Sequence, residues 1–278
     1  MESLLTIRRC GGAAELRPIS AVFFLLVLFL SARGLPAQTV RIAAASDLQF
    51  ALGDLAAQYE KQSGARLAIT YGSSGNFFAQ IQNGAPFDLF FSADVAYPQR
   101  LIEGGYAEAD SLSTYAFGRL VLWLPPESPL DPAKLQWSTL SDARVQKIAI
   151  ANPDHAPYGR AAVAALQKTG FYEQVRSKLV YGENISQAAQ FVVSDSAQAG
   201  ILAMSIAVAP SMKSGKIWEI PRDSYPPIEQ AVVLVKSSPN KAAANRFLAF
   251  LKTESARANL ARYGFSVPEA SRSSEAKP

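Results

Sequence analysis

The sequence predicts an α/β protein with two lobes. Short apolar runs typical of strands alternate with amphipathic runs typical of helices, and a proline-bearing connection divides this alternation into two series. Strands separated by helices indicate parallel sheets that are covered on both faces. A chain of 278 residues, 49% of them hydrophobic, can bury the core of one large or two smaller domains.

The first series predicts the first lobe, at residues 38–119 and 236–267. The strands that we expect are 40–45, 66–71 and 88–92. A helix is expected after each strand, because apolar residues recur there at helical spacing. The first of these helices carries Leu48, Leu52, Leu55 and Tyr59 on one face, the second spans 76–82, and the third ends at Gly104. Two further helices, near 241–252 and 255–262, complete this lobe.

The second series predicts the second lobe, at residues 120–235. The strands that we expect are 147–151, 178–181 and 200–203, with helices at 160–168 and 186–193. Two further apolar runs, 120–124 and 231–235, are interpreted as the strands that cross between the lobes. The polar tail, 268–278, is expected to be disordered.

Residues 1–37 have the features of a secretory signal peptide. Arg8, Arg9 and Arg17 precede an apolar run, 19–30, that is shorter than the roughly 20 residues a membrane span needs. We expect cleavage after Ala37; an uncleaved membrane anchor is the alternative.

The chain has one cysteine and one histidine, which excludes disulfides and several kinds of metal site. The single cysteine, Cys10, lies in the signal segment, so the exported chain is expected to have no disulfide and no thiolate metal site. The single histidine, His155, excludes a His-rich metal site. The 27 Lys and Arg residues nearly balance 23 Asp and Glu residues, which argues against a nucleic-acid partner.

Four junctions between a strand and a helix are rich in serine, asparagine and glycine. They are 45–49, 72–76, 152–159 and 182–187. Helix N-termini offer unpaired N–H groups and a positive dipole end, and such junctions gather at the carboxyl ends of strands. Together they predict an anion site without lysine or arginine. Taken singly, each polar residue can also be a helix cap; Ser46 and Gln49, for example, have the spacing of a capping box.

An enzymatic function is poorly supported by these residues. A nucleophilic Ser46 or Ser74 would need a base, and His155 is the only imidazole. Asp88 and Asp94 flank a strand end, where solvation and capping explain them equally well. The glycine-serine run 72–75 lacks the Gly-Lys-Ser/Thr ending of a P-loop, which argues against nucleotide binding.

Five motifs resemble the periplasmic molybdate-binding proteins of molybdate ABC importers. They are AAASDL at 43–48, YGSSGNF at 71–77, GAPFDLFFSAD at 84–94, NPDHAPYGRAA at 152–162 and YPPIEQAVVLV at 225–235. The resemblance implies a type II periplasmic-binding-protein fold with the ligand cleft between the lobes. It further implies a periplasmic monomer that captures molybdate, or tungstate, and delivers it to a membrane permease, with no cofactor and no catalysis.

The resemblance also implies which residues hold the anion. Ser46 and Ser74 match the two serines of the first lobe, and Tyr158 and Ile185 match the backbone N–H donors of the second. The molybdenum would be bound only as its oxyanion, with no direct protein ligand.

The chain departs from the family pattern at Ala203, where many members have a tyrosine whose hydroxyl reaches the anion. Tyr158 and Tyr225 are candidates to replace that hydroxyl, and Asp47 is a candidate for an additional N–H donor. The rival interpretations are a binding protein for sulfate or phosphate, an exported hydrolase and the effector domain of a transcription factor.

Overall fold

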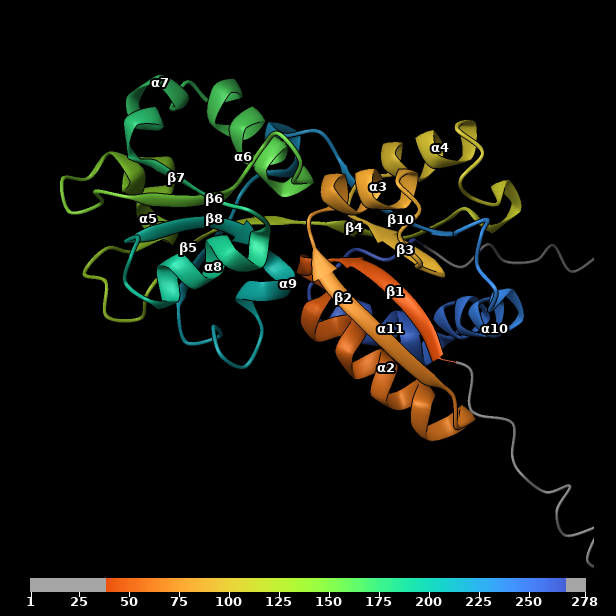
Figure 1. Cartoon of the computed structure of the whole chain (residues 1–278). Coiled ribbons are helices and arrows are strands. Elements are labelled where there is room, and N and C mark those ends of the chain that lie inside the picture. Colours follow the sequence, from red (N-terminus) through yellow and green to blue (C-terminus); the bar gives the residue numbers. More distant parts are fainter. Residues whose placement is uncertain (1–38, 269–278) are drawn as a thin grey trace, which may run out of the picture. The chain divides into compact units, whose positions relative to one another are not determined.

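The computed structural model describes residues 39–268 (Figure 1). The expected signal peptide with Cys10, and all but the first residue of the expected tail, lie outside the described residues. No helix within 39–268 combines the length and the apolar character that a membrane span requires.

The first sheet has five strands in the order β2-β1-β3-β10-β4. The strands are β1 (Thr39–Ala45), β2 (Arg66–Gly72), β3 (Leu89–Ser92), β4 (Ser113–Gly118) and β10 (Ile228–Leu234). β1 pairs in parallel with β2 and β3, so that Ile42 lies opposite Ile69 and Leu89. β1 is buried along most of its length because both faces of the sheet are covered.

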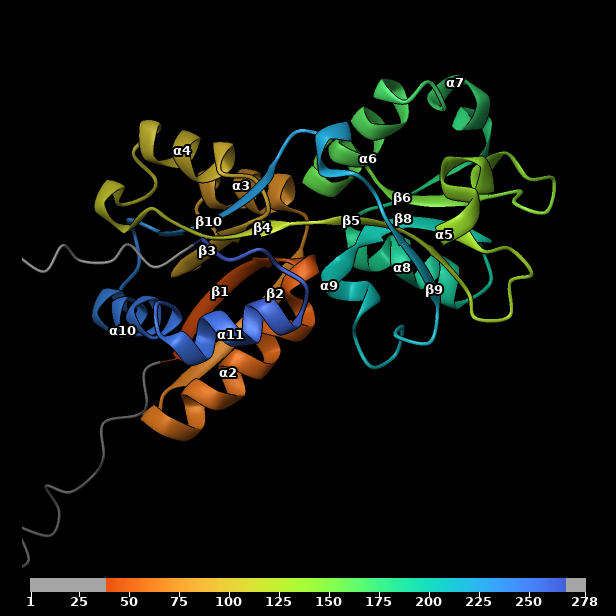
Figure 2. The ribbon, with the colours of Figure 1, turned by 180° about the vertical axis from the view of Figure 1, so that it is seen from behind.

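Helices cover the two faces of this sheet in two groups. The helices are α2 (Gln49–Ser63), α3 (Ser74–Gln82), α4 (Ala96–Glu103), α10 (Lys241–Leu251) and α11 (Glu254–Arg262). α2, α10 and α11 share one apolar core, to which Leu52 and Phe247 belong. α3 and α4 share the other, with Phe78 and Leu101 (Figures 1 and 2). The carboxyl ends of β1 and β2 pass almost directly into helix starts, at Ser46 and at Ser74.

The second sheet also has five strands, in the order β7-β6-β8-β5-β9. The strands are β5 (Leu120–Leu124), β6 (Ile148–Ala151), β7 (Leu179–Gly182), β8 (Ala199–Ala203) and β9 (Lys216–Glu219). The helices are α5 (Pro132–Leu135), α6 (Pro157–Lys168), α7 (Tyr172–Val175), α8 (Ile185–Val193) and α9 (Met204–Ala207). α6 and α8 lie on opposite faces of the sheet (Figures 1 and 2).

The sheets are mixed, whereas the sequence predicts parallel sheets. β6 is parallel to β7 and β8, but β5 is antiparallel to β8, and β10 is antiparallel to β3. The reason is the route of the chain. β4 continues into β5 across Arg119, and 220–227 lead from β9 back into β10. A strand that arrives from the other lobe enters at the carboxyl edge of its new sheet, so it must run against the parallel strands.

All eight expected strands are present, but the second lobe is smaller than expected. β10 lies in the first sheet between β3 and β4, although the expected lobe of 120–235 includes it. β4 and β9 are absent from the expectation. β4 begins with Ser113 and Thr114, and β9 has four residues that are all half-buried, so neither forms an apolar run. The observed architecture is the two-lobed α/β fold expected from the sequence.

Candidate functional site

A small cavity lies where the carboxyl ends of both sheets meet. It is lined by Ala45, Ser46, Asp47, Gly72, Ser73, Ser74, Ala93, Ala156, Pro157, Tyr158, Asn184 and Ile185. The structure therefore brings together all four junctions predicted from the sequence. The free space there is about that of a single water molecule, because the two lobes lie closed on it.

The two serines of the first lobe are buried at the cavity. Ser74 is the first residue of α3, and its Oγ accepts a hydrogen bond of 3.0 Å from the N–H of Ala93. Because a hydroxyl also carries one donor, the Ser74 O–H is available to an acceptor. Ser46 follows β1, and its Oγ donates to Asn184 Oδ1 at 3.1 Å in the other lobe. Hydrogen bonds thus fix both serine hydroxyls at the wall of the cavity, Ser74 through its own lobe and Ser46 through the other.

The two predicted backbone donors lie at helix starts in the second lobe. Tyr158 is the second residue of α6 and Ile185 the first residue of α8. N–H groups in the first turn of a helix have no partner within that helix. Pro157 begins α6 and has no N–H, so Tyr158 presents the first free donor of that helix. These N–H groups and the helix dipoles favour negative charge in the cavity.

Asp47 is the only charged side chain among the lining residues of the described chain, and it turns toward a buried polar cluster. Its Oδ2 accepts hydrogen bonds from Tyr158 Oη at 3.0 Å and from Gln230 Nε2, whereas Oδ1 has no partner. Burial raises the pKa of Asp47 to about 6, although the hydrogen bonds from Gln230 and Tyr158 oppose this shift. Burial, and then the charge of Asp47, raise the pKa of Tyr158, so its hydroxyl stays a neutral donor.

The other further candidates are not at the cavity. Tyr225 Oη accepts from the N–H of Leu120 at 3.1 Å, and Ala203 ends β8 next to α9. Neither lines the cavity. The hydroxyl of Tyr158 already serves Asp47. Among the residues from 39 to 268, no tyrosine hydroxyl therefore takes the position that the family tyrosine would have.

The capping box expected at Ser46 and Gln49 does not form. Ser46 begins a 3-10 turn, Ser46–Leu48, that precedes α2, and its hydroxyl makes no cap hydrogen bond. The local spacing was misleading because Ser46 bonds across the cleft to Asn184. Asn184 is the cap of α8, and its Oδ1 accepts from the N–H groups of Ser186 and Gln187 at 3.0 and 3.1 Å.

Seven of the lining residues were not singled out as ligands from the sequence, and Ser73, Ala93 and Asn184 are three of them. Ser73, rather than Ser74, caps α3 by accepting from the N–H of Asn76 at 3.3 Å. Its Oγ also lies 3.0 Å from His155 Nδ1 of the second lobe. Ala93 and Asn184 line the cavity as well. The position of Ala93 directly after β3 is a signal in the sequence, because it is one more carboxyl strand end.

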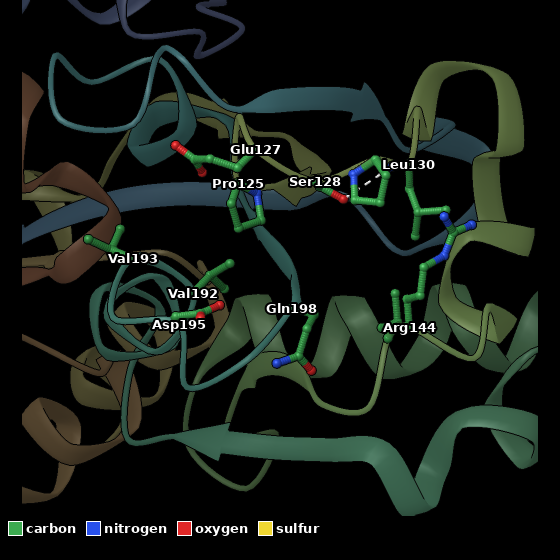
Figure 3. Close-up of a pocket in the computed structure, with 11 residues that line it drawn as sticks. Pro125, Glu127, Ser128, Leu130, Arg144, Val192, Val193, Asp195 and Gln198 are labelled. Atoms are coloured by element: carbon green, nitrogen blue, oxygen red, sulfur yellow. Dashed lines mark hydrogen bonds between the residues drawn. The ribbon is translucent and has the colours of Figure 1, made fainter.

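A larger pocket of about 500 Å³ lies in the second lobe and shares no residue with the cavity (Figure 3). Its walls include Val192, Val193, Arg144 and Gln198. Arg144 pairs with Asp142 at 2.8 Å, and Gln198 Oε1 accepts from two backbone N–H groups. The lining also includes the carboxylates of Glu127 and Asp195, which disfavour an anion. The cavity between the lobes is therefore the better candidate for the ligand site.

Comparison with known proteins gives a consistent result. Residues 40–266 match the family described as bacterial extracellular solute-binding protein. The molybdate-binding protein ModA of Rhodobacter capsulatus is 38% identical, over 83% of this chain and 90% of its own length. ModA of Azotobacter vinelandii is 37% identical, over 83% and 91%.

The solved structures agree with these relatives. The periplasmic molybdate-binding protein of Azotobacter vinelandii superposes with a TM-score of 0.78 at 34% identity, covering 83% of this chain and all of that one. The sulfate-binding protein SubI of Mycobacterium tuberculosis has a TM-score of 0.68 at 16% identity, covering 84% and 88%. At that identity the likeness to SubI shows a shared fold alone.

Proposed function

The chain belongs to the bacterial extracellular solute-binding proteins, and we propose that the solute it captures is molybdate. The family match and the relatives confirm the resemblance inferred from the sequence motifs, and the chain is a solute-binding protein and not an enzyme. One relative is named as a putative ABC transporter substrate-binding lipoprotein. Two relatives above 35% identity that are named for molybdate binding support this ligand.

The observation that carries the proposal is a buried cavity of hydrogen-bond donors with no cationic side chain in its lining. Ser74 offers its O–H directly, and Ser46 offers its O–H when it turns from Asn184 Oδ1, which keeps the N–H groups of Ser186 and Gln187. Tyr158 and Ile185 supply N–H groups at helix starts. Each hydrogen bond to a charged group contributes roughly 1.5–3 kcal/mol. Several of them together offset a desolvation cost on the order of several kcal/mol per ion.

A cavity lined by hydrogen-bond donors favours an anion that carries no proton of its own. Molybdate is a dianion without a proton at neutral pH, so it only accepts hydrogen bonds. Phosphate retains a proton and needs an acceptor, and Asp47 is the one side chain in the lining that offers a carboxylate. Sulfate has the right charge but shorter bonds to oxygen, so donors held at the distances that molybdate needs would contact its oxygens less well. Tungstate is nearly the size of molybdate, and we expect it to bind as well.

The division of the donors between the lobes couples binding to closure. An anion that contacts Ser46 and Ser74 on one lobe, and Tyr158 and Ile185 on the other, binds the closed state better than the open one and shifts the population toward it. We propose that the closed, loaded protein works in the periplasm as a monomer, without a cofactor, and delivers the anion to the membrane permease of an ABC importer.

Calorimetric titration with molybdate, tungstate, sulfate and phosphate tests the ligand. We expect molybdate and tungstate to bind with similar affinity, and sulfate and phosphate at least about 100-fold more weakly, a difference of roughly 3 kcal/mol. The absence of a molybdate response, or tighter binding of sulfate or phosphate, would defeat the proposal.

Serine variants test the site. Ser46→Ala and Ser74→Ala each remove one donor, and we expect each to raise the Kd for molybdate by about 10- to 100-fold. Ser63→Ala is the matched control, because Ser63 bonds to the Tyr59 carbonyl at the end of α2, away from the cavity. Equal affinity of both cavity variants and the wild type would show that the anion lies elsewhere.

A further inference from the structure

Arg160 joins the two lobes beside the cavity. It lies on α6 of the second lobe, and its Nη2 is 2.5 Å from Oδ2 of Asp94, which follows β3 in the first lobe. Arg160 Nη1 also donates to Tyr97 Oη at 3.1 Å, and the guanidinium lies 5.4 Å from the centre of the Tyr97 ring. One side chain thus makes three kinds of contact with the opposite lobe.

The partners of Arg160 are held in place by their own lobe. Asp94 Oδ1 accepts from the N–H of Ala96 at 2.9 Å, so the carboxylate is fixed between the start of α4 and the guanidinium. The N–H and the carbonyl of Asp94 both bond to Ser92 Oγ. Tyr97 is buried on α4 and packs against Phe78. Arg160 therefore meets a preformed acceptor when the lobes close.

The contact flanks the anion donors without touching the cavity. Arg160 is two residues after Tyr158, and Asp94 directly follows Ala93, whose N–H bonds to Ser74. Neither Arg160 nor Asp94 lines the cavity. The pair can therefore stabilise the closed state of the lobes without binding the anion.

Among the eight ion pairs within residues 39–268, this one connects a helix of the second lobe to the edge of the cavity in the first. Its side chains are 38% and 29% exposed, so water screens the pair less than it screens a surface pair. The other hydrogen bonds across the same rim involve fewer charges, as in Asn76 Nδ2 to Glu183 Oε1 at 3.0 Å.

We propose that Arg160, Asp94 and Tyr97 form an interlobe latch that sets the closed fraction and the dissociation rate of the anion. The proposal rests on the proposed function, namely capture of an oxyanion by closure. The apparent affinity of a ligand is proportional to the fraction of protein in the binding-competent state. A latch outside the cavity therefore tightens binding without a new contact to the anion, and it acts mainly by slowing reopening.

A second role for Arg160 has to be separated from the latch. Its positive charge could attract the anion through space, with no need for Asp94. The two roles predict opposite effects of Asp94→Asn. Loss of the latch weakens binding, whereas loss of a negative charge near an anion strengthens it.

The test measures Kd by calorimetry and the dissociation rate of radiolabelled molybdate for Arg160→Ala, Asp94→Asn and the double variant. We expect each single variant to raise Kd about 5- to 30-fold, chiefly through faster dissociation, and the double variant to match the more severe single one. Tyr97→Phe, which loses only the hydroxyl, should have a smaller effect in the same direction.

Arg262→Ala is the matched control, because it breaks an ion pair with Asp54, of 2.8 Å, within the first lobe. It should leave both quantities unchanged. Unchanged or tighter binding by Asp94→Asn, or additive effects in the double variant, would overturn the latch. Failure of the wild type to bind molybdate would instead reject the proposed function. Thermal unfolding without ligand verifies that each variant is folded.

Discussion

At the scale of single residues, Asp47 is a carboxylate of the site whose burial lowers the stability of the folded protein when it is ionised. Its carboxylate is buried beside a cavity for anions, and burial raises its pKa from 3.8 to about 6. Between about pH 4 and pH 6 the folded protein holds the proton and the unfolded chain does not. The free energy of unfolding therefore falls as pH rises through this window. The stability that protonated Asp47 contributes at low pH is absent above about pH 6.

Asp47→Asn should remove this pH dependence. From pH 4.5 to pH 7.5, the wild type should lose about 2 kcal/mol more of its free energy of unfolding than the variant does. Urea denaturation at the two pH values measures the difference.

The control for this experiment is Ser63→Ala, which removes no titratable group and should leave the pH dependence as in the wild type. An equal pH dependence in Asp47→Asn and the wild type would show that Asp47 does not titrate in this range.

At the scale of elements, the donors depend on how closely helix starts approach strand ends. A Cβ on Gly159, in the first turn of α6, would clash with the carbonyl of Ala151 at the end of β6. A Cβ on Gly182 would lie 2.5 Å from the N–H nitrogen of Ala188 in α8. Glycine at these two places lets the N-termini of α6 and α8 lie against the sheet, which sets the positions of the Tyr158 and Ile185 donors.

Two glycine variants separate close approach from helix propensity. Gly159→Ala should lower the free energy of unfolding by about 1–3 kcal/mol and weaken molybdate binding, because the start of α6 must move. Gly53→Ala, in α2, meets only Tyr71 Oη at 4.0 Å and should raise stability by up to about 1 kcal/mol with no effect on binding.

Urea denaturation and calorimetry measure both quantities for the two glycine variants. A Gly159→Ala variant with the stability and affinity of the wild type would contradict the role given to this contact.

At the scale of the whole molecule, function depends on closure between the lobes. Gly75 on α3 and His155 of the second lobe meet at the cleft, where the N–H of Gly75 donates to the His155 carbonyl at 2.9 Å. A Cβ on Gly75 would lie 2.7 Å from that oxygen and 2.8 Å from the Cβ of His155. These distances leave no room for a side chain while the lobes are closed.

Gly75→Ala should therefore obstruct closure. We expect the Kd for molybdate to rise at least about 10-fold, the equivalent of roughly 1.4 kcal/mol, while thermal unfolding without ligand stays near that of the wild type. Small-angle scattering with saturating molybdate should show a larger radius of gyration than the loaded wild type. A loaded variant as compact as the wild type, with the same Kd, would refute this account.

Local patterns in the chain are sufficient for much of this architecture. The alternation of apolar strands and amphipathic helices depends on contacts between near neighbours, so the two series and eight strands can be read from the sequence. For the same reason the junctions that contain Ser46, Ser74, Tyr158 and Ile185 can be located, since each is a strand end followed by a helix start.

The tertiary structure decided which of these residues meet. Asp47 bonds to Gln230, 183 residues away, and Ser46 to Asn184, 138 residues away. The tertiary structure also placed Ala93 at the cavity, Ala203 and Tyr225 outside it, and β10 in the first sheet. Periodicity carries no information about such pairs, because they depend on how two independently patterned lobes pack across a cleft. The sequence by itself determined the lobes and their helix starts, and only their closure determined the site.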